Sequence, residues 1–305
     1  MRDEDIEAFL AIVETGTITE AAESLYTTQS SISKRISSLE RQLGTTLVVR
    51  GKGLRSVELT GHGERFLGIA RRHEALCKES ESLHLSPNLE KLSACSIELV
   101  NSYVLSGFYR TFFDTHENVR LSIHTHHSSE VYNMVRAHVV DIGIAYAQMP
   151  SPDVAIAPLY REPMVLVTHP AAKLPDPVSP HDLDPSEEVY LRWSREYELW
   201  HDRLFPGAEY RMHAGNCRLI SPFLTNPQRW AITPVSVATS LMHSGEAAVR
   251  LLGEAPSKRT CYLVESRTPR HANARAVSAF KDALRDFIRD DPDLEAARNV
   301  GTSRG

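Results

Sequence analysis

The sequence has no apolar run of membrane-spanning length, and residues 2 to 7 are mostly acidic. A bilayer-spanning helix needs about 20 predominantly apolar residues, and a secretory leader needs a basic start followed by an apolar stretch. The chain also has only 4 cysteines among 305 residues, without a C-x-x-C pair. A disulfide framework, a structural zinc cluster and a redox-sensing cysteine pair are therefore not expected. We expect a cytoplasmic protein with buried thiols and no membrane association.

Signatures of several enzyme classes are missing as well. The α/β part of the chain contains no G-x-S-x-G, H-E-x-x-H, phosphate-binding P-loop or G-x-G-x-x-G motif. Its 42% apolar and 24% charged residues are typical of a globular protein, and 305 residues suffice for two or three compact units. We expect no catalytic residue, no cofactor and no metal site. The alternative is an enzyme that carries an accessory DNA-binding module.

Three short amphipathic helices are predicted within the first 43 residues. An apolar stripe from Ile6 to Val13 ends at Gly16, a residue type typical of the position after a helix. Thr17 and Glu20 then have the spacing of a capping box, which predicts a second helix. A third stripe follows at helical spacing: Ile32, Ile36, Leu39 and Leu43. Short helices with a tight turn before the third describe a helix-turn-helix unit.

The third helix has a basic face of short side chains opposite its apolar stripe. Thr28 is the predicted N-cap, so the helix begins at Gln29 with free backbone N–H groups that suit a phosphate. An ordinary solvated face is the alternative. After Gly44, two extended runs around a glycine-flanked turn predict a β-hairpin wing. We expect double-stranded DNA to contact Thr28, Gln29, Ser30, Ser31, Ser33, Lys34, Arg35, Ser38, Arg50, Lys52 and Arg55.

The charge of this region is distributed unevenly. One acid, Glu40, lies among the cations Lys34, Arg35, Arg41, Arg50, Lys52 and Arg55, whereas the other acids of the region lie on the first two predicted helices. A whole-chain net charge of −5 therefore hides a basic surface of the kind that binds nucleic acid.

One stretch of the chain carries a family resemblance. AFLAIVETGTITEAAESLYTTQSSISKRISSLERQLGTTLVVR, followed by LTGHGERFL, resembles the DNA-binding domain of LysR-type transcriptional regulators over its full length. Ile18, Ser30 and Val48 replace the family's usual Phe, Pro and Phe, and Ser30 bears on base contacts. The resemblance implies a regulator that binds inverted-repeat DNA as a dimer or tetramer and responds to a small-molecule effector. It implies a winged helix-turn-helix domain, mainly α, over residues 1–60.

A long helix is predicted from Thr60 to about Leu85, where the sequence has no proline. Phe66, Ala70, His73 and Cys77 step along one side of it, a face too long for the small domain to cover. Such faces usually pair with another helix. In the family, the equivalent linker helix forms the dimer, so residues 61–88 are the expected linker, with Phe66 in its seam.

Apolar strands and helices alternate beyond Leu89, as in a parallel α/β sheet. The stretch EPMVLVTHPAAKLP resembles the family's crossing into a second half-domain, and TCYLVES resembles the return. The resemblance implies a periplasmic-binding-protein-like regulatory domain over 89–305. Its first half comprises 89–160 and 265–291, and its second half 163–262. A solute-binding transport component is disfavoured, because we see no export signal.

The effector is expected between these halves, because α/β sheets bind ligands beyond the carboxyl ends of their strands. Strand ends give these candidates: Glu98, Asn101, Ser102, His126, His127, Ser128, Ser129, Tyr146, Arg192, Trp193, Ser194 and Asn216. Four of these, Asn101, Ser102, Ser128 and Ser129, also precede predicted helices, so ordinary helix caps are the alternative. His124 and His126 share a strand face, but we see no acid or cysteine at ligand spacing beside them. We therefore expect a cleft-lining imidazole and an anionic effector.

Overall fold

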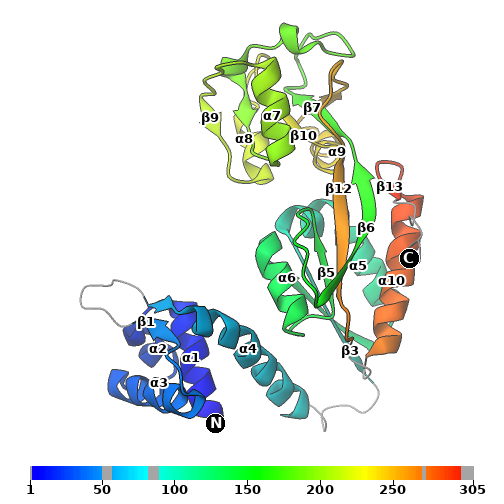
Figure 1. Cartoon of the computed structure of the whole chain (residues 1–305). Coiled ribbons are helices and arrows are strands. Elements are labelled where there is room, and N and C mark those ends of the chain that lie inside the picture. Colours follow the sequence, from blue (N-terminus) through cyan, green and yellow to red (C-terminus); the bar gives the residue numbers. More distant parts are fainter. Residues whose placement is uncertain (1, 50–56, 82–88, 270–272, 297–305) are drawn as a thin grey trace, which may run out of the picture.

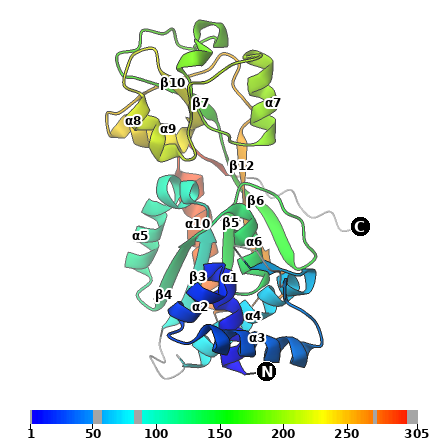
Figure 2. The ribbon, with the colours of Figure 1, turned by 90° about the vertical axis from the view of Figure 1, so that its left-hand side faces the viewer.

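The structure of the protein is a computed structural model that describes residues 2–49, 57–81, 89–269 and 273–296 (Figure 1). Three small helices and a short hairpin come first, and the long helix α4 leads from them to an α/β part with two lobes (Figures 1 and 2). The predicted fold class is confirmed. None of the helices in the described ranges is long and apolar enough to cross a membrane.

The first three helices begin and end at residues that the sequence predicts. Helix α1, Asp3–Thr15, ends where Gly16 adopts a left-handed φ of 81°. Helix α2, Ile18–Ser24, begins after Thr17, whose hydroxyl accepts the N–H of Glu20 at 3.1 Å. Helix α3, Gln29–Leu43, begins after Thr28, which accepts the N–H of Ser31 at 3.2 Å.

The apolar stripe of α3 forms part of the N-terminal core. Ile32, Ile36 and Leu39 are buried together with side chains of α1 and α2. Leu43, which we predicted in the same stripe, is 39% exposed, so that prediction is wrong. The reason is that α3 ends at Leu43, after which Gly44 turns the chain away with a φ of 68°.

The two strands that form the base of the predicted β-hairpin wing are present. Strand β1, Val48–Val49, pairs antiparallel with β2, Glu58–Leu59. Glu40 of α3 fixes this base, because its carboxylate accepts the backbone N–H groups of Leu47 at 2.9 Å and of Val48 at 3.3 Å. The predicted DNA contacts Arg50, Lys52 and Arg55 lie outside the described residues.

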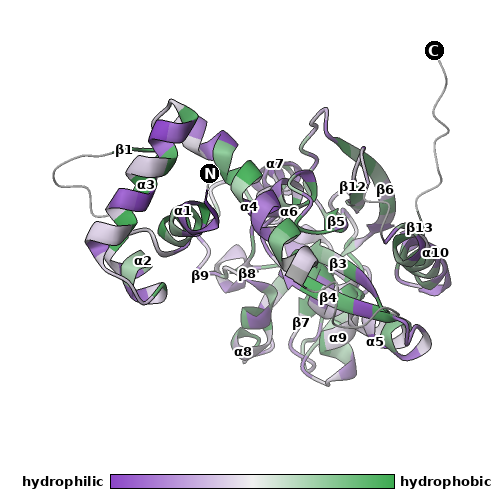
Figure 3. Ribbon diagram, turned by 90° about the horizontal axis from the view of Figure 1, so that it is seen from below, coloured by the Kyte–Doolittle hydropathy of each residue, from purple (hydrophilic) through white to green (hydrophobic). Residues whose placement is uncertain are grey.

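Helix α4, Gly61–Glu81, corrects the expected dimer seam. Phe66 and Ala70 are buried in the N-terminal core, where the rings of Phe66 and Phe9 meet edge to face with 5.2 Å between centroids. Phe66 is therefore not free to face a second copy. Two large apolar side chains of the helix are exposed: Ile69, at 54%, and Leu76, at 52%. Figure 3 shows hydrophobic and hydrophilic residues interleaved along this helix.

The lobe nearer to α4 contains a six-stranded sheet in the order β13-β6-β12-β5-β3-β4 (Figure 1). Its strands are β3 Glu90–Ser96, β4 Val119–Thr125, β5 Ile142–Ala145, β6 Val154–Glu162, β12 Arg259–Ser266 and β13 Glu295–Ala296. Strands β4, β3 and β5 are parallel, as predicted, whereas β12 runs antiparallel to β5 and β6. The sheet is therefore mixed, because the chain re-enters this lobe in the opposite direction. Strand β13 was not predicted.

Helices cover both faces of this sheet. Helices α5, Ser106–Thr115, and α10, Ala274–Asp290, share a core with Leu92 and Ala94. Helix α6, Ser128–Arg136, packs on the other face with Cys95 and Val264. Between β3 and α5 the chain forms a π-helical turn, Val100–Val104.

The second lobe is built on a three-stranded antiparallel sheet in the order β10-β7-β11. Its strands are β7 Met164–Thr168, β10 Trp230–Pro234 and β11 Ala248–Arg250. The short strands β8, Val189–Tyr190, and β9, Met212–His213, pair parallel beside it. The helices of this lobe are α7 Arg195–Leu204, α8 Ile220–Phe223 and α9 Val235–His243.

Two segments join the lobes. Strand β6 ends at Glu162 and continues into β7 after Pro163, while β12 begins at Arg259 on its way back (Figure 2). Glu162 and Arg259 are directly opposite each other in the antiparallel register. A carboxylate and a guanidinium therefore sit at the junction between the lobes.

Candidate functional site

The exposed start of α3 is the first candidate site. Thr28, Gln29, Ser30 and Lys34 are exposed, and the other predicted contacts on this helix, Ser31, Ser33, Arg35 and Ser38, are half-buried. The Thr28 hydroxyl lies 3.0 Å from the hydroxyls of both Ser30 and Ser31. These groups therefore form one hydrogen-bonding surface at the positive end of the helix. Figure 3 shows hydrophilic residues over much of α3.

The two predicted cations of α3 differ in their surroundings. Arg35 forms an ion pair with Glu4 of α1, with 3.2 Å between Nη2 and Oε2. Within the described ranges, Lys34 is exposed and has no ion-pair partner at all. Glu40, the one acid of the basic stretch, is only 9% exposed and turns its carboxylate to the wing. Lys34 is therefore the predicted contact on α3 whose positive charge is both exposed and unpaired within the described ranges.

Sequence reasoning missed Tyr26 beside this surface. Tyr26 is 99% exposed and has a left-handed φ of 50° in the turn between α2 and α3. A positive φ is uncommon for an aromatic residue, so the tight turn dictates where this ring lies. The sequence predicts the turn that contains Tyr26, but a predicted turn does not by itself show where the side chain lies.

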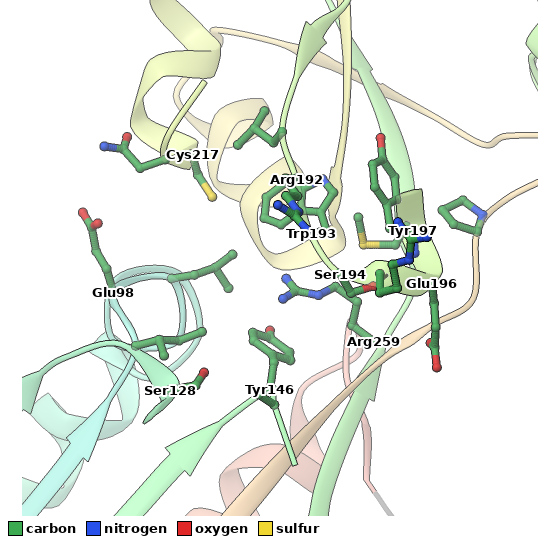
Figure 4. Close-up of a pocket in the computed structure, with 18 of the residues that line it drawn as sticks. Glu98, Ser128, Tyr146, Arg192, Trp193, Ser194, Glu196, Tyr197, Cys217 and Arg259 are labelled. Atoms are coloured by element: carbon green, nitrogen blue, oxygen red, sulfur yellow. Dashed lines mark hydrogen bonds between the residues drawn. The ribbon is translucent and has the colours of Figure 1, made fainter. Parts of the chain in front are cut away.

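The second candidate site is a cavity of about 930 Å³ between the two lobes, shown in Figure 4. Most of the predicted effector residues line it: Glu98, His127, Ser128, Tyr146, Arg192, Trp193, Ser194 and Asn216. Ser128 is the first residue of α6, and Ser194 is the N-cap of α7, whose hydroxyl accepts the N–H of Tyr197 at 3.1 Å. The cavity therefore meets the N-terminal ends of two helices, one from each lobe.

Four predicted residues are not among those that line the cavity: Asn101, Ser102, His126 and Ser129. Asn101 donates to the carbonyl of His124 at 3.0 Å and accepts the Tyr109 hydroxyl at 2.7 Å, which ties the π-helical turn to β4. Ser102 lies in the same turn, and Ser129 is the second residue of α6. The side chain of His126 faces Glu130, with 3.7 Å between Nδ1 and Oε2.

Arg259, which sequence reasoning missed, points into the cavity (Figure 4). Its guanidinium carbon lies 3.8 Å from the ring centre of Tyr146 in the first lobe and 5.1 Å from that of Trp193 in the second. Its Nη1 atom is buried and has no hydrogen-bond partner within the described part of the chain. A buried N–H without a partner costs free energy that an anionic ligand can recover.

A buried carboxylate lies next to Arg259. Glu162 is fully buried and accepts hydrogen bonds from the hydroxyls of Tyr146 and of Ser236, the latter at 2.7 Å. Burial raises the pKa of Glu162, and burial together with this carboxylate raises the pKa of Tyr146. These hydroxyls hold the Glu162 oxygens in place opposite Arg259 in the strand register.

Several other charges of the cavity are paired within the protein, whereas Glu196, which also lines it, forms no ion pair with a residue that the structure describes. Arg192 forms an ion pair with Glu198, with 2.7 Å between Nε and Oε1. Glu98 of the first lobe meets Arg218 of the second, with 3.0 Å between Oε1 and Nε, so this pair spans the cavity mouth. Pairing reduces what Arg192 can offer a ligand. Trp193 also has a structural bond, because its indole N–H donates to the Ile232 carbonyl at 2.8 Å.

The three buried cysteines of the α/β part have thiols of low reactivity. Burial raises the pKa of Cys217, which lines the cavity, to about 12, and does the same for Cys95 and Cys261. A thiol reacts as its thiolate, so these cysteines are poor nucleophiles at neutral pH. Cys77 differs, because it is half-buried on α4.

Two protein-family models match the chain. The model of bacterial regulatory helix-turn-helix proteins of the lysR family covers residues 4–64, and the model of the LysR substrate binding domain covers residues 89–289. These spans contain the two candidate sites described above.

Curated relatives match over part of their length. An uncharacterized HTH-type transcriptional regulator, YusT of Bacillus subtilis (strain 168), is 28% identical over 179 residues, which is 58% of this chain and 59% of that protein. The match thus spans less than two thirds of that relative.

Solved structures match over nearly the whole chain. CbnR, described as a LysR family transcriptional regulator, superposes with a TM-score of 0.65 at 20% sequence identity, covering 94% of this chain and 99% of that one. Full-length CbnR in complex with its target DNA gives a TM-score of 0.63 at 20% identity, covering 94% and 100%. These structures share the fold. Because these two family models together match residues 4–64 and 89–289, the chain belongs to the LysR family of bacterial helix-turn-helix transcriptional regulators.

Proposed function

We propose that this regulator binds an inverted-repeat operator through α3 and changes its DNA contacts when a small anionic molecule occupies the cavity between the lobes. The observation that carries the proposal is Nη1 of Arg259, a buried donor without a partner at the point where both lobes meet the cavity. The exposed polar start of α3 supports the DNA-binding half. A solved relative of the same fold, CbnR, is titled as a complex with target DNA, which fits this assignment.

We propose that α3 is the recognition helix, the helix that enters the major groove of DNA, and that it does so with its N-terminal turn. Gln29 and Ser30 are exposed there and have the short polar groups that reach base edges or neighbouring phosphates. Lys34 lies one turn further along and is proposed to contact the phosphate backbone, because within the described residues no acid pairs with it.

Alanine substitutions in α3 test this interface. Lys34→Ala should weaken binding to all sequences alike and reduce the salt dependence by about one unit of slope per DNA-binding domain, since one phosphate contact is lost. Gln29→Ala should cost about 1–3 kcal/mol at one base position and relax its specificity. Fluorescence anisotropy on an operator at several salt concentrations measures both, with the exposed Lys173→Ala as the control. Unchanged affinity and slope in both α3 variants would remove α3 from the interface.

The effector is proposed to be an anion with an apolar or aromatic body. Arg259 and the N-terminal ends of α6 and α7 provide positive charge at the cavity, and Tyr146 and Trp193 provide flat walls. A ligand held there would touch both lobes and so favour one closure of the two lobes over another. A ligand shifts a conformational equilibrium only through such a difference in affinity.

The pairing face of α4 is proposed to be the one that carries Ile69 and Leu76. These exposed side chains are seven residues apart, which is the repeat of a helix pair, and they lie beside the face that Phe66 buries in its own domain. A dimer formed through them would present two recognition helices to an inverted repeat.

Placing a charge on this face tests the pairing. Ile69→Asp should dissociate the dimer in sedimentation and lower operator affinity, because it introduces an unpaired charge into an apolar seam. Leu199→Asp is the matched control, since Leu199 is 56% exposed on α7, close to the 54% of Ile69. A full-affinity dimer in Ile69→Asp would show that another surface pairs the subunits.

A further inference from the structure

Three side chains with different donor atoms meet where α4 passes the start of α1. They are Asp3, the first residue of α1, and His73 and Cys77 of α4. Nε2 of His73 lies 2.7 Å from Oδ1 of Asp3 and 3.5 Å from Sγ of Cys77, and the three ligand atoms all lie within 4.8 Å of one another. Within the residues that the structure describes, no other group of three or more His, Cys, Asp or Glu side chains comes so close.

The fold explains why these residues meet. Phe66 and Ala70 pack α4 against the N-terminal core, with Phe66 on the ring of Phe9. His73 and Cys77 continue along the same side of α4, one turn apart, so they extend this packed face beyond its apolar part. These apolar contacts thus position α4 so that its following turns lie beside the first residue of α1.

The donor set suits a metal ion. In a tetrahedral zinc site, metal bonds of about 2.0–2.3 Å place a nitrogen and a sulfur ligand roughly 3.5 Å apart, and nitrogen and oxygen roughly 3.4 Å apart. The His73–Cys77 distance of 3.5 Å already matches this spacing, whereas the Asp3 side chain has to withdraw by some tenths of an ångström. Asp3 can do so, because its side chain is 80% exposed. His73 is 34% exposed, which leaves access for the ion and for a water ligand.

We propose that Asp3, His73 and Cys77 bind one divalent cation of the zinc class, which cross-links the start of α1 to the linker helix. Thiolate and imidazole ligands favour such a borderline ion over magnesium or calcium. On binding, the Cys77 thiol loses its proton to solvent, and His73 coordinates through neutral Nε2 in place of its bond to Asp3. This site has no part in the effector cavity or in the DNA-contacting face of α3.

The cross-link would stiffen the linker where it leaves the DNA-binding domain. Ala70 of α4 is buried in the N-terminal core, and Cys77 lies two turns further along the helix. A metal at this point would hold these two turns against α1. Since the ion binds the folded arrangement and not the unfolded chain, it also raises the melting temperature of the N-terminal domain.

Cobalt titration of the full-length, untagged and reduced protein tests the proposal. Co²⁺ bound to a thiolate gives a sulfur-to-metal charge-transfer band in the near ultraviolet, and tetrahedral Co²⁺ gives intense visible bands. The wild-type protein should show both at one equivalent per chain, and Zn²⁺ should displace the cobalt and bleach the bands. Cys77→Ser and His73→Asn should each lose the charge-transfer band and weaken Zn²⁺ binding at least tenfold in competition with a chromogenic chelator.

His62→Asn is the matched control for a histidine on the same helix, because His62 is exposed and lies outside the cluster. It should bind cobalt as the wild type does. Cys77→Ser keeps the three buried cysteines, so an unchanged band in this variant would overturn the site and assign the signal to them. A wild-type protein without a charge-transfer band would overturn it as well. Thermal unfolding gives a second readout: Zn²⁺ should raise the wild-type melting temperature and leave that of Cys77→Ser unchanged.

Discussion

Replacing Arg259 with methionine should abolish the response to anionic ligands while the affinity for DNA in their absence stays unchanged. The guanidinium lies against rings from both lobes, and its buried Nη1 has no partner in the described part of the chain. Loss of one partner of a buried charged contact typically costs about 2–5 kcal/mol, which corresponds to roughly 30-fold or more in Kd. Methionine keeps the length and apolar character of the stem, so the variant removes mainly the charge and its donors.

Thermal-shift measurements with a panel of mono- and dicarboxylates and their neutral amides provide the test. Carboxylates that raise the melting temperature of the wild type should fail to do so in Arg259→Met. Arg161→Met is the control, because Arg161 lies on the adjacent crossing strand, is exposed and is not among the cavity residues. A ligand shift retained in Arg259→Met, or a wild type that responds only to neutral or cationic compounds, would contradict the anionic assignment.

Gly63→Ala should unfold the DNA-binding domain, whereas Gly68→Ala on the same helix should stabilise it. A Cβ atom on Gly63 would lie 2.0 Å from the carbonyl oxygen of Leu47, a backbone atom that cannot move aside cheaply. This carbonyl also accepts the N–H of Thr60 at 2.9 Å, so the clash falls where α4 begins against the wing. Overpacking typically costs about 1–3 kcal/mol and occasionally more, and we expect this site at the upper end.

A Cβ on Gly68 meets nothing within 4 Å, so alanine there should gain about 0.5–1 kcal/mol from its better helix propensity. Calorimetry of the full-length variants should show a lowered or missing N-terminal transition for Gly63→Ala, with the transition of the α/β lobes unchanged. Operator binding should be lost in the same variant. Equal melting of Gly63→Ala and Gly68→Ala would mean that the wing and α4 do not pack as described.

The helix-turn-helix part could be predicted from sequence because its signals are local. Gly16, Thr17, Thr28 and Gly44 mark helix ends through their own backbone preferences, and the structure has helix ends at each of them. Phe66 was assigned to the dimer seam because helical spacing shows that a face is apolar but not what covers it. Phe9, far away in the sequence, covers it here.

Only some of the cavity residues could be predicted from the sequence, and the reason is topological. Parallel strands bring their carboxyl ends to one edge of the sheet, and this rule found Glu98, Ser128 and Tyr146. Strand β12 runs the other way, so its amino end reaches the same edge with Arg259. The direction of a returning strand depends on the whole chain path, which the residues around Arg259 do not encode.

The central claim is that a dimer of this protein binds an inverted repeat. The most direct test is to mix the wild-type protein with sheared genomic DNA and to sequence the fragments that it binds. A dimer with two recognition helices requires half-sites related by two-fold symmetry and separated by about one helical turn of DNA, 10–10.5 base pairs, or a multiple of it. We therefore predict that the enriched fragments share an inverted repeat with such a spacing. Fragments enriched without any shared sequence, or with a single half-site and no symmetric partner, would contradict the account.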